Sequence, residues 1–96
     1  MSSRSFETVH LSIDTADAHR TIIAEVDGIR PRRIDGSVEY RDDGGMLIAL
    51  LSSDVVDGRG ESKLRYQTSI LSPPLAHGEA KAREIYEAVV DHRVPR

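Results

Sequence analysis

The side chains best suited to acid–base or metal chemistry in this sequence are its histidines. There are four of them: His10, His19, His77 and His92. No two are four residues apart, the spacing that places two imidazoles on one face of a helix for metal binding. The pattern therefore assigns no catalytic residue, no metal ligand and no cofactor.

His10 is the best candidate for a general base, because we expect it on the polar face of a strand. An enzyme would need a pocket that joins it to other polar groups of the same sheet face, such as Glu39 and Arg65. The stretch Ser52–Asp54 offers hydroxyls beside a carboxylate, but the sequence fixes no histidine near it. A solvated surface histidine is the simpler interpretation, and an enzyme or small-ligand-binding protein stays an alternative.

The arginines form the other candidate binding group. Arg30, Arg32 and Arg33 fall in one expected connector, and Arg59 lies at the tip of a predicted hairpin. Their guanidinium groups suit phosphate, because the planar fork matches phosphate oxygens. The net charge of −3, and a content of one Phe, three Tyr and no Trp, argue against nucleic acid. We expect a solvated arginine loop, with an RNA- or ribosome-associated domain as the alternative.

Length and composition indicate one small globular domain, residues 1–96, in which we expect residues 1–5 to be flexible. The absence of cysteine excludes disulfides and thiolate zinc sites. No apolar stretch approaches the roughly 20 residues of a membrane span, and the N-terminus lacks the apolar core of a signal peptide. We therefore expect a cytoplasmic protein with no membrane partner. Eleven arginines against two lysines fit a GC-rich or salt-adapted prokaryote.

Hydrophobic periodicity and turn residues predict six elements in the order β-α-β-β-β-α. They are a strand over 6–13, a helix over 15–27 capped by Asp14, strands over 34–40, 45 to about 54–56 and 63–70, and a helix over about 76–92. Residues 29–33 are expected to form a connector, because Pro31 excludes helix.

These elements predict an α+β two-layer sandwich, an antiparallel meander with two helices on one face. The element order is similar to that of ribosome-hibernation proteins and, without the first strand, of double-stranded-RNA-binding domains. No sequence motif accompanies this similarity, so it implies a fold and no function.

The pair Asp43-Gly44 predicts a two-residue type I′ hairpin turn, because both central positions of that turn need positive φ. A second turn is expected within residues 57–60. Both turns together place three residues of the strand between them on the core face: Leu47, Ala49 and Leu51. A slip of one residue would destroy this agreement between the two hairpins.

The other apolar residues of that strand are then expected on the outer face of the sheet. Met46, Ile48 and Leu50, with Leu71 on the next strand, would form an apolar stripe rimmed by charge. Such a stripe is typical of an interface. We expect a small interaction module that self-associates as a homodimer through this face. A terminal segment that covers the stripe and a small-molecule groove are the alternatives, and the role of Gly78 in the last helix stays open.

Overall fold

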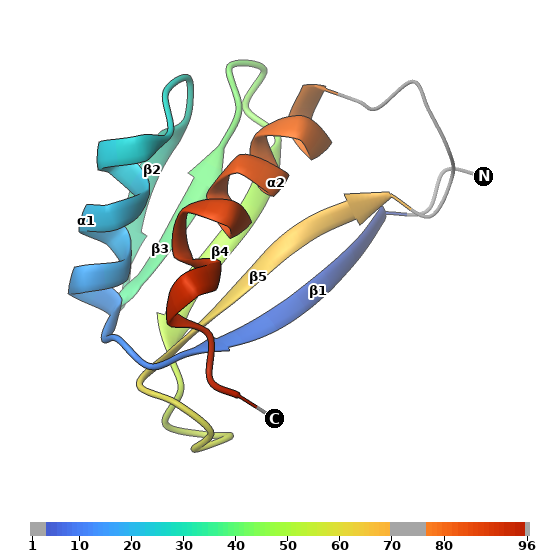
Figure 1. Ribbon diagram of the computed structural model, residues 1–96. Helices are drawn as coiled ribbons and strands as arrows, with labels where there is room; N and C mark the ends of the chain where they lie inside the picture. Colours follow the sequence, from blue (N-terminus) through green and yellow to red (C-terminus); the bar gives the residue numbers. More distant parts are fainter. Residues whose placement is uncertain (1–3, 70–76, 96) are drawn as a thin grey trace.

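The computed structural model describes residues 4–69 and 77–95. They form a five-stranded antiparallel sheet and two α-helices, so the expected α+β class is confirmed (Figure 1). The elements are β1 (Arg4–Leu11), α1 (Thr15–Glu25), β2 (Arg30–Ile34), β3 (Ser37–Arg41), β4 (Leu47–Ser53), β5 (Ser62–Ser69), α2 (His77–Val89) and a short 3-10 helix (Val90–His92). The strand order is β1-β5-β4-β3-β2, and both helices lie on one side of the sheet (Figure 1). No helix within the described ranges is long and apolar enough to cross a membrane.

Helix α1 begins as the sequence predicts. The Asp14 side chain accepts the Asp17 amide at 2.8 Å, which satisfies one of the unpaired donors of the first turn. The helix ends two residues earlier than expected, because Val26 adopts an extended conformation while its amide still bonds to the Ile22 carbonyl. Ala18, Ile22 and Val26 are all buried, so the predicted apolar stripe does face the sheet.

Strand β2 occupies the segment for which a connector was expected. All five of its residues are exposed, and it pairs only with β3 at the edge of the sheet. An edge strand tolerates Pro31, because one side of such a strand has no neighbour and a residue without an amide proton loses no ladder hydrogen bond there. Pro31 therefore excluded a helix, as expected, but not a strand.

Two tight turns differ from the expectation: Asp35 and Gly36 were expected inside a strand over 34–40, and the turn at Asp43-Gly44 is of another type. Asp35 and Gly36, with φ of 48° and 82°, form the two-residue turn between β2 and β3, which is where the positive φ angles of a type I′ turn are found. The Asp43-Gly44 pair instead belongs to a three-residue loop that ends on Gly45, with φ of 86°. The Asp42 amide bonds to the Met46 carbonyl across this loop at 3.0 Å.

A β-bulge in β4 decides which residues enter the core. Tyr40 pairs with Ala49, whereas Arg41 pairs with Leu47, so that Ile48 is an extra residue without an opposite partner. The bulge turns Ile48 toward the helices beside Ala49, and both side chains are fully buried. The prediction that Ile48 lies on the outer face is therefore wrong.

The bulge also moves Leu47 off the core face: Leu47 lies opposite Arg41 and is half-buried, so its expected core position is wrong. Ala49 and Leu51 are on the expected core face even though their register is shifted. Tyr40 was expected opposite Leu47 and Ala49 opposite Thr68, but Ala49 lies between Tyr40 and Tyr66. A shift of two residues keeps every side chain on its face, because the side-chain period of a strand is two. The resulting core consists of Leu11, Ala18, Ile22, Val26, Val38, Tyr40, Ile48, Ala49, Leu51, Leu64, Ala82, Ile85 and Val89.

The expected outer stripe is thus reduced. Met46 and Leu50 are half-buried, and Leu50 lies between Glu39 and Arg65 on the neighbouring strands. Leu71 lies outside the described residues. An interface at Met46 and Leu50 stays a prediction, but its expected centre, Ile48, is part of the core.

Replacing Ile48 with alanine is expected to lower the free energy of unfolding by about 2–5 kcal/mol, because a fully buried aliphatic side chain is removed and a cavity remains. Leu50→Ala is the matched control, and it should cost less because Leu50 is only half-buried. Urea unfolding of both variants measures the difference. Equal losses would contradict the inward orientation of Ile48.

Candidate functional site

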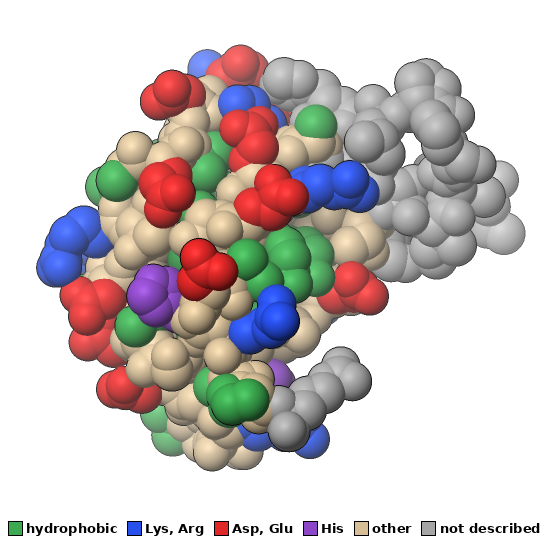
Figure 2. Space-filling view, in the orientation of Figure 1, with side chains coloured by type: hydrophobic (Ala, Val, Ile, Leu, Met, Phe, Trp, Pro, Cys, Tyr) green, Lys and Arg blue, Asp and Glu red, His purple; other side chains and the backbone are tan. Residues whose placement is uncertain are grey.

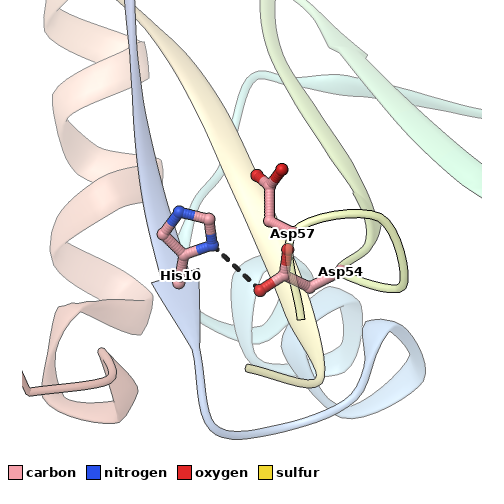
Figure 3. A group of neighbouring side chains, drawn as sticks. All are labelled: His10, Asp54 and Asp57. Atoms are coloured by element: carbon pink, nitrogen blue, oxygen red, sulfur yellow. Dashed lines mark hydrogen bonds and ion pairs between the residues drawn. The ribbon is translucent and has the colours of Figure 1, made fainter. Parts of the chain in front are cut away.

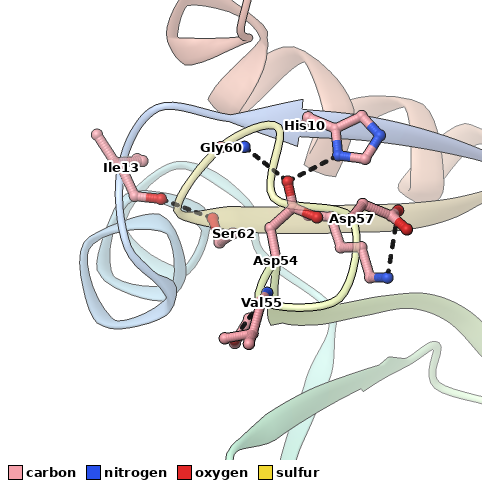
Figure 4. Close-up of polar contacts among 9 residues, drawn as sticks. His10, Ile13, Asp54, Val55, Asp57, Gly60 and Ser62 are labelled. Atoms are coloured by element: carbon pink, nitrogen blue, oxygen red, sulfur yellow. Dashed lines mark hydrogen bonds and ion pairs between the residues drawn. The ribbon is translucent and has the colours of Figure 1, made fainter.

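The loop that joins β4 to β5, residues 54–61, is built around one buried carboxylate. The Asp54 side chain has no exposed surface, and its Oδ2 accepts the Gly60 amide at 2.7 Å and the Nδ1 proton of His10 at 2.9 Å (Figure 4). His10 lies in β1, so this carboxylate joins the loop to the edge strand of the sheet. These two residues are 44 positions apart in the sequence, so no local spacing predicts their contact.

Backbone hydrogen bonds hold the rest of the loop in place. The Gly58 amide bonds to the Asp54 carbonyl at 2.8 Å, and the Glu61 amide bonds to the Leu11 carbonyl of β1 at 2.9 Å. Ser62, which follows the loop, donates its hydroxyl to the Ile13 carbonyl at 2.7 Å (Figure 4). The loop is therefore tied to the β1–α1 connection by backbone contacts as well as by the Asp54 side chain.

The tip of the loop exposes two adjacent valines. Val55 and Val56 are 85% and 89% exposed, the largest values among the large hydrophobic residues that the structure describes as exposed. The sequence had placed both at the end of a strand. The strand instead ends at Ser53, and the Ser53 hydroxyl accepts the Val55 amide at 3.3 Å as the chain turns.

Electrostatics favour the ionised form of Asp54. Burial raises the pKa of its carboxyl, but the hydrogen bonds from His10 and the Gly60 amide, with smaller contributions from the His10 charge and the Arg59 amide, lower it by more. The pKa therefore lies below its ordinary value of 3.8. An ionised carboxylate can only accept, so His10 Nδ1 carries a proton in this pair.

Asp57 comes close to the same pair from within the loop (Figure 3). Ligand atoms of His10, Asp54 and Asp57 all lie within 4.8 Å of one another. The Asp57 carboxylate also faces the Lys63 ammonium, at 3.6 Å from Nζ to Oδ2. An imidazole and two carboxylates in this arrangement can bind a cation or transfer a proton.

A shallow groove of about 1280 Å³ runs along β1 beside this pair. Figure 2 shows the surface hollowed on its right side, next to a group of hydrophobic side chains. Its lining residues come from β1, β5, α2, the loop and the C-terminal segment: Glu7, Thr8, Val9, His10, Arg59, Tyr66, Tyr86, Arg93, Val94 and Pro95. The C-terminal segment is held to the edge of β1 by a bond of 2.7 Å from the Val94 amide to the His10 carbonyl.

Two tyrosines form the aromatic part of this groove. The rings of Tyr66 and Tyr86 are 4.7 Å apart, and the Tyr66 hydroxyl donates to Glu7 at 3.3 Å. Burial, together with the Glu7 charge and Tyr86, raises the pKa of Tyr66 to about 12. The Tyr66 hydroxyl therefore stays protonated near neutral pH and acts as a hydrogen-bond donor or acceptor, not as a base.

The predicted arginine group is divided by the fold. Arg30, Arg32 and Arg33 lie on β2, whereas Arg59 lines the groove beside β1, the opposite edge of the sheet. Within β2 the register alternates, so that Arg32 is opposite Glu39 and Arg33 is opposite the buried Val38. The structure brings no common phosphate site together from these four residues.

Within the described part of the chain, the other histidines and Glu39 lie outside the group of His10, Asp54 and Asp57. His19 Nδ1 lies 2.7 Å from the hydroxyl of the buried Tyr40, and burial together with the Arg33 charge lowers the pKa of His19. His92 is exposed in the 3-10 helix, and His77 begins α2. Glu39 bonds to Arg41 and not to His10, so the expected outer-face group of His10, Glu39 and Arg65 is not assembled.

Acid should weaken the fold through Asp54. Because the pKa of this carboxyl is lower in the folded protein than its ordinary 3.8, its contribution is fully present above that value and is lost as the pH falls through the folded pKa. Asp54→Asn should remove the contribution. Urea unfolding at about pH 7 and about pH 3 should therefore show a difference between variant and wild type that shrinks in acid. A difference independent of pH, or one that Asp43→Asn reproduces, would contradict this role.

Gly60→Ala should destabilise the protein, because a Cβ atom at this position would overlap the Leu11 carbonyl oxygen and crowd the Val94 side chain. Relieving the overlap would move the loop away from β1 and stretch the Glu61 amide bond to Leu11. Gly44→Ala is the control, because only one side-chain atom, at 3.4 Å, lies near its Cβ position. Thermal unfolding should show a clear loss for Gly60→Ala and little change for Gly44→Ala.

The end of the sheet thus joins an anchored loop, a buried carboxylate paired with an imidazole, and a groove with two tyrosines. No protein-family model, curated protein or solved structure matches this chain.

Proposed function

We propose that this protein is a small interaction module that self-associates through the tip of loop 54–61. The observation that carries the proposal is the exposure of Val55 and Val56, 85% and 89%, on a loop whose base is fixed by a buried carboxylate. Adjacent valines in this position leave apolar surface in water, which a partner surface removes.

The anchoring of the loop supports a binding role. A loop that is already held by Asp54, Gly58 and Glu61 loses little conformational freedom when a partner docks on its tip. Apolar side chains on such a loop contribute more of their burial energy to association than the same side chains on a flexible loop.

Charge at the tip favours a second copy of the chain as the partner. Arg59 and Glu61 are exposed and make no side-chain ion pair within the residues that the structure describes. Across a two-fold axis the same patch meets itself, so each Arg59 can face the Glu61 of the other copy while the valines pack in the centre.

The expected strength of this association is low. Full burial of a valine contributes about 1.5–3 kcal/mol, so four valines supply about 6–12 kcal/mol against an association cost of about 4–15 kcal/mol. We therefore propose a dimer with a dissociation constant that is about micromolar or weaker.

The loop replaces the outer sheet face as the proposed interface. Ile48, the expected centre of the outer face, lies in the core, and Met46, Leu47 and Leu50 are half-buried within one chain. The arginines that would support an RNA-associated domain are divided between opposite edges of the sheet.

Replacing Val55 and Val56 together with serine is expected to weaken self-association at least about tenfold, because the apolar centre of the contact is lost. Sedimentation equilibrium over about 1 μM to about 1 mM measures the dissociation constant of wild type and variant. The matched control is Ile23→Ser, which changes an aliphatic residue that is 48% exposed on α1, away from the loop.

A wild type that stays monomeric over this range, or equal effects of the loop variant and the control, would reject the proposal. Leu50→Ser separates the two interfaces, because it should leave a loop-mediated dimer unchanged and would disrupt one formed through the outer face.

A further inference from the structure

The group formed by His10, Asp54 and Asp57 has the composition of a transition-metal site. It offers one imidazole nitrogen and two carboxylates, with ligand atoms that lie within 4.8 Å of one another. Ligand atoms of a tetrahedral zinc ion, bound at about 2.0–2.2 Å, lie about 3.3–3.6 Å apart, so the group must close by up to about 1.5 Å. Asp57 can supply this closure, because its side chain is 46% exposed and lies in a loop, whereas Asp54 is fixed.

A second observation points to a ligand at this group. Asp54 Oδ1 is buried and accepts no hydrogen bond from any residue that the structure describes. Figure 3 shows this oxygen directed toward Asp57, while the other oxygen of the same carboxylate bonds to His10. A buried carboxylate oxygen without a partner is costly in a folded protein, and a cation between Asp54 and Asp57 would satisfy it.

The fold itself uses only one of the two Asp54 oxygens. Oδ2 accepts the Gly60 amide that holds loop 54–61 in place, and this bond can persist while Oδ1 binds a metal. The imidazole can join the ligand set through Nδ1, the nitrogen that faces the carboxylates, when its proton moves to Nε2.

The mixed donor set favours zinc over harder cations. Imidazole nitrogen suits Zn²⁺ and its neighbours in the transition series, whereas Ca²⁺ and Mg²⁺ prefer oxygen ligands alone. Mn²⁺ accepts the same donors but binds a given site more weakly than Zn²⁺.

Lys63 occupies part of this space in the metal-free protein. Its ammonium lies 3.6 Å from Asp57 Oδ2, and it balances one of the two negative charges. A divalent cation would have to displace it from Asp57. Lys63 therefore lowers the affinity of the group for a metal, in contrast to the three ligand residues.

We infer that His10, Asp54 and Asp57 form a zinc-binding site at the base of loop 54–61, in which Lys63 holds Asp57 when the metal is absent. The inference does not depend on the proposed self-association, because all three ligands come from one chain.

Isothermal titration of Zn²⁺ into the wild-type protein near neutral pH is expected to show one ion bound per chain. Asp57→Asn should weaken binding at least about tenfold, because it removes a charged ligand that the fold does not need. Lys63→Met should strengthen binding, because the competing ammonium is lost. Mn²⁺ should bind more weakly than Zn²⁺ to the same protein.

Asp43→Asn is the matched control, because it removes an exposed aspartate in the β3–β4 loop and should leave Zn²⁺ binding unchanged. Circular dichroism of each variant checks the fold. An absence of Zn²⁺ binding, or equal binding by wild type and Asp57→Asn, would overturn the inference; the second result would indicate an ion on an exposed histidine such as His92. A weaker affinity in Lys63→Met would also count against it.

Discussion

A buried carboxylate requires hydrogen-bond donors, and at Asp54 these come from two distant parts of the chain. His10 belongs to the edge strand β1, and Gly60 belongs to the loop that leads into β5. An ionised group closed off from water is costly without such donors, so the loop and the end of β1 take their positions together. The exposed end of the loop is consequently held from its base. Its two valines are therefore displayed on an anchored loop and are largely exposed in the described structure.

The bulge in β4 explains how an over-apolar strand fits a sheet that has helices on one side only. Strict alternation over Leu47–Leu51 would leave Ile48 on the face without helices. The extra residue instead places Ile48 and Ala49 together under the helices, and it leaves Leu50 as the half-buried residue of the outer face. The apolar run is thus buried largely within one chain. The most exposed large hydrophobic residues of the described structure lie instead in loop 54–61.

The parts of the fold that depend on local patterns could be predicted from the sequence. The Asp14 cap, the stripe of α1, the core face of β3 and β5, and the positions of Ala49 and Leu51 in β4 follow from spacings of two to four residues. The inner and outer positions of Leu47 and Ile48 were predicted the wrong way round. Strand β2 was missed because all of its residues are exposed, so its sequence shows no alternation of apolar and polar residues. The bulge was missed because every residue around Ile48 is apolar, so the hydrophobic pattern does not show where the alternation is interrupted. The pair of His10 and Asp54 was missed because it depends on the pairing of β1 with β5. The only local signal was the unusual density of Asp and Gly in residues 54–60.

The two oxygens of Asp54 have different tasks, and this separates folding from ligand binding at one residue. Oδ2 is engaged by the Gly60 amide and the imidazole, so the geometry of the loop is already set without any ion. Oδ1 has no hydrogen-bond partner among the described residues and is directed toward Asp57, whose side chain is 46% exposed. A metal there would replace the hydrogen bond from His10 to Oδ2 while the Gly60 bond persists, so it would modify an existing anchor and would not create it. This differs from small zinc domains, which fold only with their metal. Because the tip valines lie on the same loop, binding at its base would hold them in the position that they already have. It would make the loop more rigid, and the same two valines would stay exposed at its tip.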